Sequence, residues 1–142
     1  MYPYNIPGLQ LKIHANAVAK GFYDKRPEVG TQLMLVVSEL GEALEAHRKG
    51  KFANTAYFES RKAELEGSIP ATLSNDEYAA EYNRIAANLF ELHIKDSFED
   101  ELADAVIRIL DTAASLGIDL EWYILHKMKY NEGRERLHGK AY

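Results

Sequence analysis

Two pairs of acidic residues with helical spacing are the strongest candidates for chemistry in this sequence. Glu39 and Glu42 are three residues apart, and so are Glu101 and Asp104. On a helix this spacing turns both carboxylates of a pair to the same side. If the two helices pack side by side, four carboxylates converge, and carboxylate oxygens are the ligands that Mg²⁺ and Mn²⁺ prefer. The pattern is therefore that of a divalent-cation site acting on phosphate esters.

The same acids admit a purely structural interpretation. Each pair lies opposite an apolar stripe, and a surface helix normally carries its charges on that opposite, solvated side. Spacing alone leaves both interpretations open. The stripes consist of Leu33, Val36, Val37, Leu40 and Leu44 in the first helix, and of Leu102, Val106, Ile109, Leu110 and Ala113 in the second.

A basic segment near the C-terminus is the second candidate. The run 126–140 holds five Lys or Arg against two Glu in a chain of net charge −5. Lys127, Asn131 and Arg134 share one face of a predicted helix, where they suit phosphate oxygens. The alternative is a helix end whose cations complement the helix dipole.

Helices must position these residues. Long stretches without Pro or Gly predict an all-α protein, and no strand-like alternation persists. Glycines after the first two helices, and Ser74, Ser97 and Asp119 before the later ones, mark their ends. We expect a helical bundle in one domain, 1–142, with a helical insertion or arm at 51–95 between the acidic helices. The predicted helices are about 9–20, 27–49, 54–66, 75–93, 97–116 and 119–134.

Composition excludes several classes of function. The chain has 142 residues, a length typical of one domain, and its acidic balance argues against a nonspecific nucleic-acid binder. It has no cysteine, which excludes disulfides, thiolate zinc sites and a Cys nucleophile. No apolar run approaches the roughly 20 residues of a membrane span, and the N-terminus lacks a signal-peptide pattern. We therefore predict a soluble, cytoplasmic protein.

Three segments together resemble the MazG-like, all-α nucleoside triphosphate pyrophosphohydrolases: SELGEALEAHRKGK, DELADAVIRILDTAASLGIDLEW and KMKYNEGR. The family pattern is ExxE, then ExxD, then Lys-x3-Asn-x2-Arg. It falls here on Glu39 and Glu42, on Glu101 and Asp104, and on Lys127, Asn131 and Arg134. Two departures are Ser38, where the family often doubles the acid, and the 58 residues between Glu42 and Glu101.

The resemblance implies a function. The four acids would bind Mg²⁺, or Mn²⁺, and take part in cleaving a (d)NTP to (d)NMP and pyrophosphate. Lys127 and Arg134 would contact the phosphates, with Asn131 also in the substrate site. The resemblance also implies a helical homo-oligomer, a dimer or a tetramer. The rival hypothesis is a non-catalytic helical homo-oligomer or adaptor that keeps the fold.

Base recognition has weaker candidates, because aromatic residues at helical spacing more often belong to a core. His14 and Asn16 lie in the first predicted helix, and both could line a pocket or face solvent. The aromatic candidates are Phe22, Tyr23, Tyr57, Phe58, Trp122 and Tyr130.

Overall fold

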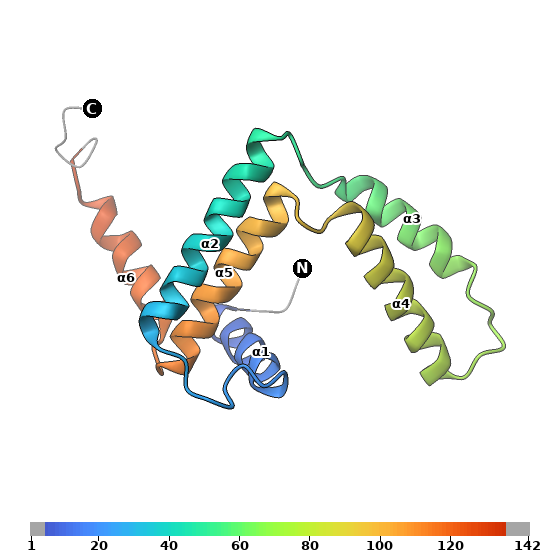
Figure 1. Ribbon diagram of the computed structural model, residues 1–142, viewed down its shortest axis with the longest axis horizontal. Helices are drawn as coiled ribbons and strands as arrows, with labels where there is room; N and C mark the ends of the chain where they lie inside the picture. The colour runs from blue at the N-terminus through green and yellow to red at the C-terminus, as the bar shows by residue number, and fades with distance from the viewer. Residues whose placement is uncertain (1–4, 136–142) are drawn as a thin grey trace. The chain divides into compact units, whose positions relative to one another are not determined.

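The computed structural model describes residues 5–135, which form six α-helices and, over that range, no strand (Figure 1). The predicted all-α class is confirmed, and the predicted helices are found close to their expected bounds. The helices are α1 Ile6–Ala19, α2 Val29–Arg48, α3 Thr55–Gly67, α4 Asn75–His93, α5 Phe98–Ser115 and α6 Leu120–Glu132.

Side chains at the helix ends explain where the helices begin. The Asn5 side chain accepts from the backbone of Gly8 at 2.9 Å, so α1 begins earlier than predicted. Ser74 and Glu77 form a reciprocal capping box at the start of α4. Asp119 accepts from the backbone of Trp122 at 3.1 Å and begins α6. The predicted caps at Ser74 and Asp119 are therefore confirmed.

The chain folds as two compact units. Unit 1 combines the N-terminal residues up to Leu35 with the residues from Val106 onward, and unit 2 is Val36–Ala105. Helices α2 and α5 each contribute one part to both units. The assignment of 1–142 to one domain stays a prediction.

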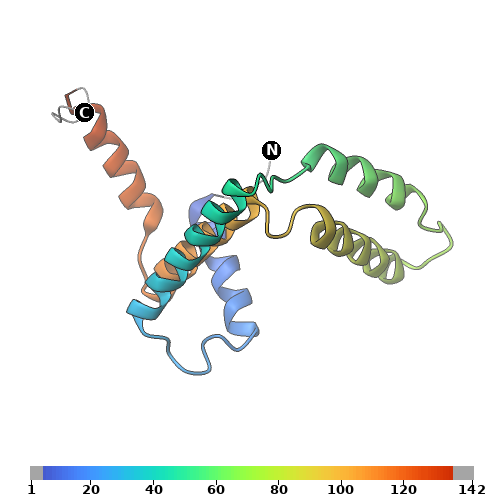
Figure 2. The same cartoon turned by 45° about the horizontal axis from the view of Figure 1, so that its top comes forward.

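Unit 2 contains an antiparallel helical hairpin made of α3 and α4, which lie side by side in both views (Figure 2). Ile69, Ile85 and Leu89 form its small buried core. At its base, the backbone amide of Phe98 donates to the carbonyl of Lys51 at 2.9 Å. Helices α3 and α4 therefore form a hairpin, and the chain before it at Lys51 is hydrogen-bonded to the chain after it at Phe98.

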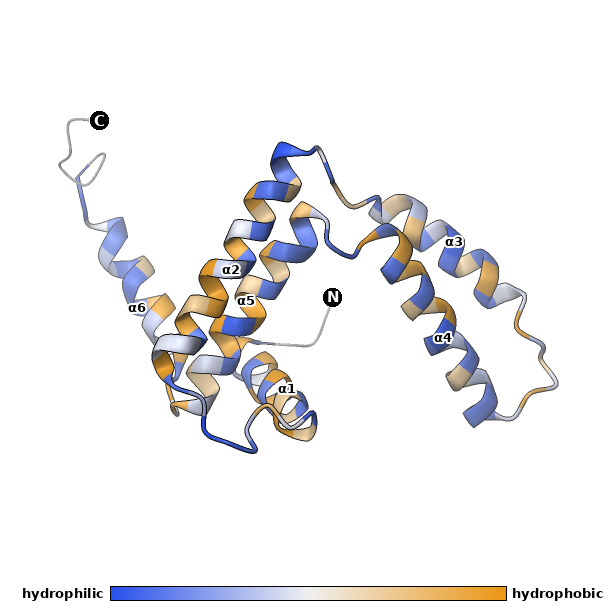
Figure 3. Cartoon of the chain, viewed as in Figure 1, coloured by the Kyte–Doolittle hydropathy of each residue, from blue (hydrophilic) through white to orange (hydrophobic). Residues whose placement is uncertain are grey.

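The apolar stripes of α2 and α5 did not pack as expected. Leu40 and Leu44 remain 48% and 49% exposed, whereas Ala43 and Ala46 are buried. In Figure 3 orange apolar residues lie along both helices. In unit 2 the buried residues of these two helices include Ala43, Ala46 and Ala105 together with Glu39 and Glu101. Val36, Leu110 and Ala113 are the buried stripe members; Leu33, Val37, Leu40, Leu44, Leu102, Val106 and Ile109 are exposed.

Candidate metal centre

Three carboxylates from two helices of unit 2 meet at one point. Glu39 and Glu42 come from α2, and Glu101 comes from the first turn of α5. Each offers a carboxylate oxygen, and these oxygens all lie within 4.8 Å of one another. Asp104, one turn after Glu101, is half-buried. The structure thus brings together three of the four acids predicted to converge, with the fourth on the next turn of α5.

Burial sets this cluster apart from an ordinary charged surface. Glu39 and Glu101 are only 9% and 5% exposed, so the interpretation of these two acids as solvated is wrong. Burial raises the pKa of the Glu101 carboxyl, and the charges of Glu42, Asp104 and Glu39 raise it further. A buried carboxylate beside other carboxylates is stabilised by a proton or a cation. The cluster therefore favours a bound positive charge.

Glu42 is the exposed member of the cluster and forms its solvent side. Its carboxylate accepts a hydrogen bond from the Ser38 hydroxyl at 3.3 Å, one turn earlier on α2. Ser38 is the residue at which the sequence departs from the doubled acid of the MazG-like pattern. It contributes a neutral donor that orients Glu42, in place of another negative charge.

Aromatic packing and backbone contacts hold the two acidic helices at this end of unit 2. The rings of His47, Phe52 and Phe98 meet edge to face, with centroids 5.3 to 6.1 Å apart. The backbone amide of Ala53 donates to the Glu99 carboxylate at 2.8 Å. These contacts link the C-terminal end of α2 to the start of α5, which fixes the spacing between Glu42 and Glu101.

The predicted phosphate-binding residues lie in unit 1, on α6 and just beyond it. The Lys127 ammonium lies 4.8 Å from the centre of the Tyr130 ring, and the Arg134 guanidinium carbon lies 5.8 Å from it. Asn131 is half-buried, and its side-chain oxygen has no hydrogen-bond partner among the described residues. Lys127 and Arg134 thus flank one ring, while Asn131 is more enclosed. The basic run from residue 136 onward lies outside the described residues.

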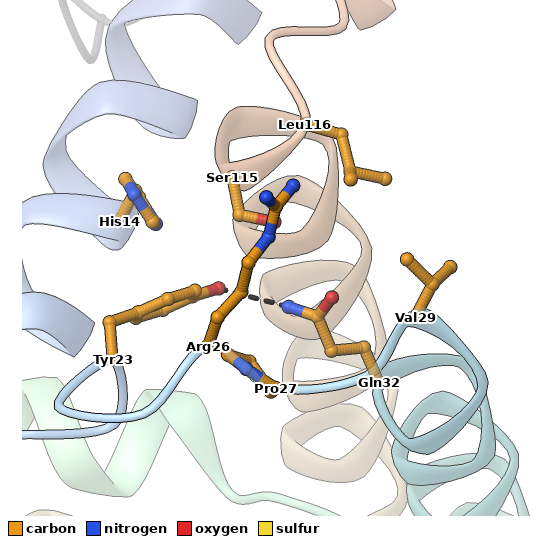
Figure 4. A pocket seen from close by; sticks show the side chains of 8 residues that line it. All are labelled: His14, Tyr23, Arg26, Pro27, Val29, Gln32, Ser115 and Leu116. Carbon is orange, nitrogen blue, oxygen red and sulfur yellow. Dashed lines mark hydrogen bonds between the residues drawn. The ribbon is translucent and has the colours of Figure 1, made fainter.

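Unit 1 also contains a cavity that the sequence did not reveal, with a volume of about 220 Å³. His14 lines it, one of the two outcomes considered for that residue, whereas Asn16 is exposed. Figure 4 shows the lining side chains, which come from α1, the loop after it, α2 and the end of α5. They are His14, Tyr23, Arg26, Pro27, Val29, Gln32, Ser115 and Leu116.

A chain of hydrogen bonds forms one side of this cavity. Asp111 on α5 receives His14 Nδ1 on one carboxylate oxygen and the Tyr23 hydroxyl on the other, each at 2.8 Å. The Gln32 side-chain amide donates to the Tyr23 oxygen at 3.0 Å. Burial raises the pKa of the Tyr23 hydroxyl, and its bond to Asp111 raises it further. Tyr23 is therefore held as a neutral donor.

Asp111, Gln32, Arg26 and Ser115 are possible functional residues that the sequence reasoning missed. One signal was present, because Asp111 follows Asp104 by two helical turns and belongs to the polar side of α5. Once that side carries buried Glu101, polar residues further along it become candidates for buried contacts.

Comparisons with known proteins identify no relative. No family model matches the chain, and neither a curated protein nor a solved structure does. The MazG-like likeness therefore stays a resemblance carried by the motifs. In the part of the chain that the structure describes, no helix is long and apolar enough to span a membrane.

Proposed function

We propose that the protein is a Mg²⁺-dependent nucleoside triphosphate pyrophosphohydrolase. The observation that supports this most is the meeting of Glu39, Glu42 and Glu101, with carboxylate oxygens within 4.8 Å of one another and two of the three side chains buried. Clustered carboxylates match the hard-oxygen ligand sets of Mg²⁺ and Mn²⁺. The order of acidic and basic motifs supplies the substrate class by resemblance.

Glu39, Glu42, Glu101 and Asp104 would hold the metal in this proposal. Glu39 and Glu101 supply buried charge, and Glu42 supplies the ligand open to solvent. Held by these residues, Mg²⁺ would supply positive charge that neutralises the phosphates and makes the α-phosphorus easier to attack. A carboxylate of the cluster that the metal does not fully occupy orients the attacking water or takes its proton.

The reaction is a hydrolysis with a simple balance. The oxygen of water bonds to the α-phosphorus, and the bond from that phosphorus to the bridging oxygen of the β-phosphate breaks. The products are a nucleoside monophosphate and pyrophosphate, and the proton from water passes to a base or to solvent. Lys127 and Arg134 balance charge on the phosphates, and Asn131 contributes a polar contact to the substrate.

Self-association belongs to the same proposal. In unit 2, Val37, Leu40 and Leu44 share one face of α2 by their spacing and are between 48% and 54% exposed, and Leu102 on α5 is 39% exposed. Apolar faces of this kind normally mark protein contacts. A second copy that presents the same face would bury both, which yields the homodimer or homotetramer that the resemblance implies. Replacing Leu40 and Leu44 by Glu should then shift the mass measured by light scattering to that of a monomer.

Measurement of pyrophosphate release tests the proposal directly. The full chain is incubated with each common (d)NTP and millimolar Mg²⁺, and ³¹P NMR identifies the products. We expect monophosphate and pyrophosphate in Mg²⁺, no turnover in EDTA, and none with Glu42→Gln. Glu99→Gln is the matched control, because Glu99 lies at the start of α5 outside the cluster and Gln retains its acceptor for Ala53. Release of orthophosphate from the γ position would contradict the proposal.

The second candidate is a non-catalytic homo-oligomer or adaptor, favoured by the same exposed apolar face of unit 2. The two candidates differ in one measurement. An adaptor self-associates but releases no pyrophosphate from any nucleotide with Mg²⁺ or Mn²⁺. A cytoplasmic location, where nucleotides and Mg²⁺ are abundant, suits the enzyme.

A further inference from the structure

The hydrogen-bond chain in unit 1 fixes which end of the Gln32 amide faces the cavity. The Tyr23 hydroxyl donates its single hydrogen to the Asp111 carboxylate. The Tyr23 oxygen must then accept its second bond, which only the NH₂ end of the Gln32 amide can donate. Gln32 is 7% exposed, so this end is not free to exchange with water.

The side-chain oxygen of Gln32 consequently faces the cavity. In Figure 4 the side-chain oxygen of Gln32 points away from Tyr23, toward the space beside Val29 and Leu116. Arg26, whose guanidinium can only donate, lies at the same cavity. The cavity therefore presents the oriented oxygen of Gln32 and the donor cation of Arg26, together with the polar side chains of His14 and Ser115 and apolar side chains.

The size of the cavity limits what it can hold. Its volume of about 220 Å³ is below the roughly 300–1,000 Å³ typical of sites for drug-sized ligands. A whole nucleotide does not fit, but one planar ring does. Apolar side chains such as Val29 and Leu116 suit the faces of such a ring, and an arginine guanidinium stacks on planar bases.

We propose that this cavity selects a nucleobase with an exocyclic amino group over one with a keto group in its place, a cytosine-type base over a uracil-type base, with Gln32 accepting a hydrogen bond from the amino group. Tyr23 and Asp111 are positioning residues that hold Gln32 in this orientation. The identification of the ligand as the base of the substrate rests on the proposed function. The selection itself follows from the cavity.

The preference for an amino group over a keto group has a physical reason. The exocyclic amino group of a cytosine-type base points outward and is not flanked by a carbonyl oxygen. A single acceptor can therefore receive its hydrogen bond. In a uracil-type base the ring N–H lies between two carbonyl oxygens, whose lone pairs repel a lone acceptor. An amide with both ends free could bind either base, because its oxygen accepts and its NH₂ group donates. The NH₂ group of Gln32, however, already donates to the Tyr23 oxygen.

Nucleosides test this proposal without phosphate or metal. The full chain, in EDTA, is titrated with deoxycytidine, deoxyuridine and deoxyadenosine, and ¹⁵N NMR follows the side-chain NH₂ group of Gln32. We expect deoxycytidine to shift that signal and to bind about tenfold more tightly than deoxyuridine, the scale of one hydrogen bond. Equal affinity for all three nucleosides would overturn the proposal.

Tyr23→Phe separates orientation from mere packing. This variant keeps the ring but frees the Gln32 amide to turn, so the preference for deoxycytidine over deoxyuridine should fall about tenfold, to near one. The matched control is Tyr123→Phe, since Tyr123 is exposed on α6 and does not line the cavity. Gln32→Leu should also remove the preference, and it provides a second variant if the first does not fold. If a folded Tyr23→Phe or Gln32→Leu variant keeps the preference for deoxycytidine, Gln32 is not the residue that recognises the amino group.

The failure of this proposal can be distinguished from failure of the proposed hydrolase. Glu42→Gln, in unit 2, should abolish pyrophosphate release while deoxycytidine binding persists. If the wild type binds deoxycytidine but releases no pyrophosphate, the hydrolase proposal fails alone. If it hydrolyses all bases at the same rate and binds no nucleoside, the base selection fails alone.

Discussion

Two carboxylates on α5, the half-buried Asp111 and the buried Glu101, have opposite surroundings. Asp111 in unit 1 receives the Tyr23 hydroxyl and His14 Nδ1, one on each oxygen. Glu101 in unit 2 lies among other carboxylates, and the charges that act on it are negative. Side-chain donors satisfy the first carboxylate, whereas the second is stabilised only by a proton or a cation. The comparison shows why only the cluster of unit 2 is a metal centre in our proposal.

The comparison carries a wider lesson about acidic residues on helices. The number and spacing of acids do not distinguish a structural carboxylate from a ligand, since Asp104 and Asp111 lie on the same helix. What distinguishes Asp111 from Glu101 is the set of groups around each carboxylate, which are side-chain donors for Asp111 and further carboxylates for Glu101. The following experiments should break or sharpen this distinction.

The largest effect should come from neutralising the cluster. Glu39→Gln, Glu42→Gln, Glu101→Gln and Asp104→Asn should each reduce kcat by at least about 100-fold, because each removes a charged ligand. Steady-state measurement of pyrophosphate release gives kcat. Glu121→Gln, on α6, should change it little. Near wild-type turnover in Glu42→Gln at saturating Mg²⁺ would show that the metal assignment is wrong.

Mg²⁺ should stabilise the wild type and fail to stabilise a cluster variant. A ligand that binds only the folded state contributes about 2.7 kcal/mol at 100 times its Kd. Thermal melts in EDTA and in millimolar Mg²⁺ should therefore show a higher Tm with Mg²⁺ for the wild type and almost no change for Asp104→Asn. An equal increase in both proteins would indicate nonspecific binding and would remove the cluster as a metal centre.

Neutralising Asp111 should destabilise the fold, whereas neutralising Glu101 should not. Asp111→Asn loses a charged acceptor for two donors, so we expect a loss of about 1–3 kcal/mol in the free energy of unfolding. In EDTA, Glu101→Gln should be neutral or stabilising, because it removes repulsion. Urea denaturation of both variants measures this difference. Destabilisation of the same size in both variants would mean that the two carboxylates have equivalent environments.

The cations of α6 should act on phosphate rather than on metal. Lys127→Ala and Arg134→Ala should each raise KM for a triphosphate by about tenfold, the scale of one charge-assisted contact. Affinity for Mg²⁺ alone, measured calorimetrically, should remain close to that of the wild type. A large loss of Mg²⁺ affinity in Arg134→Ala would contradict this division of roles.

The smallest effect should be a pH dependence of the metal-free protein. The pKa of Glu101 is raised above its ordinary 4.5 in the folded state. Protonated Glu101 therefore favours folding, and this stabilisation is fully present below about 4.5 and lost as pH rises through the raised folded pKa. In EDTA, the difference in Tm between wild type and Glu101→Gln should move in favour of the wild type as pH falls from 7 toward 5. A constant difference would show that Glu101 does not titrate abnormally.

The helices and their ends could be predicted because they depend on local chemistry. Ser74 caps α4 through residues within one turn, and Gly50 follows α2 with a left-handed φ of +66°. The end of α6 was harder to predict. Gly133 closes this helix, so Arg134 lies beyond it rather than on the same helical face as Lys127.

The candidate site was predictable only in part. The repeated acidic spacing indicated that Glu39, Glu42 and Glu101 could meet. The pattern of apolar and polar residues around the helix did not show which side of α2 packs inward. In the structure Ala43 and Ala46 are buried, and Leu40 and Leu44 are exposed. The bond from Tyr23 to Asp111 joins residues 88 positions apart, and no local pattern in the sequence encodes such a pairing.

The closed base of the α3–α4 hairpin has a consequence for how this chain can vary in length. The backbone bond from Phe98 to Lys51 means that the chain departs from and returns to nearly the same place. The entropy cost of closing such an excursion grows only slowly with its length. The hairpin is consequently a position where evolution or an engineer can shorten, extend or exchange a module and leave the acidic ends of α2 and α5 in register.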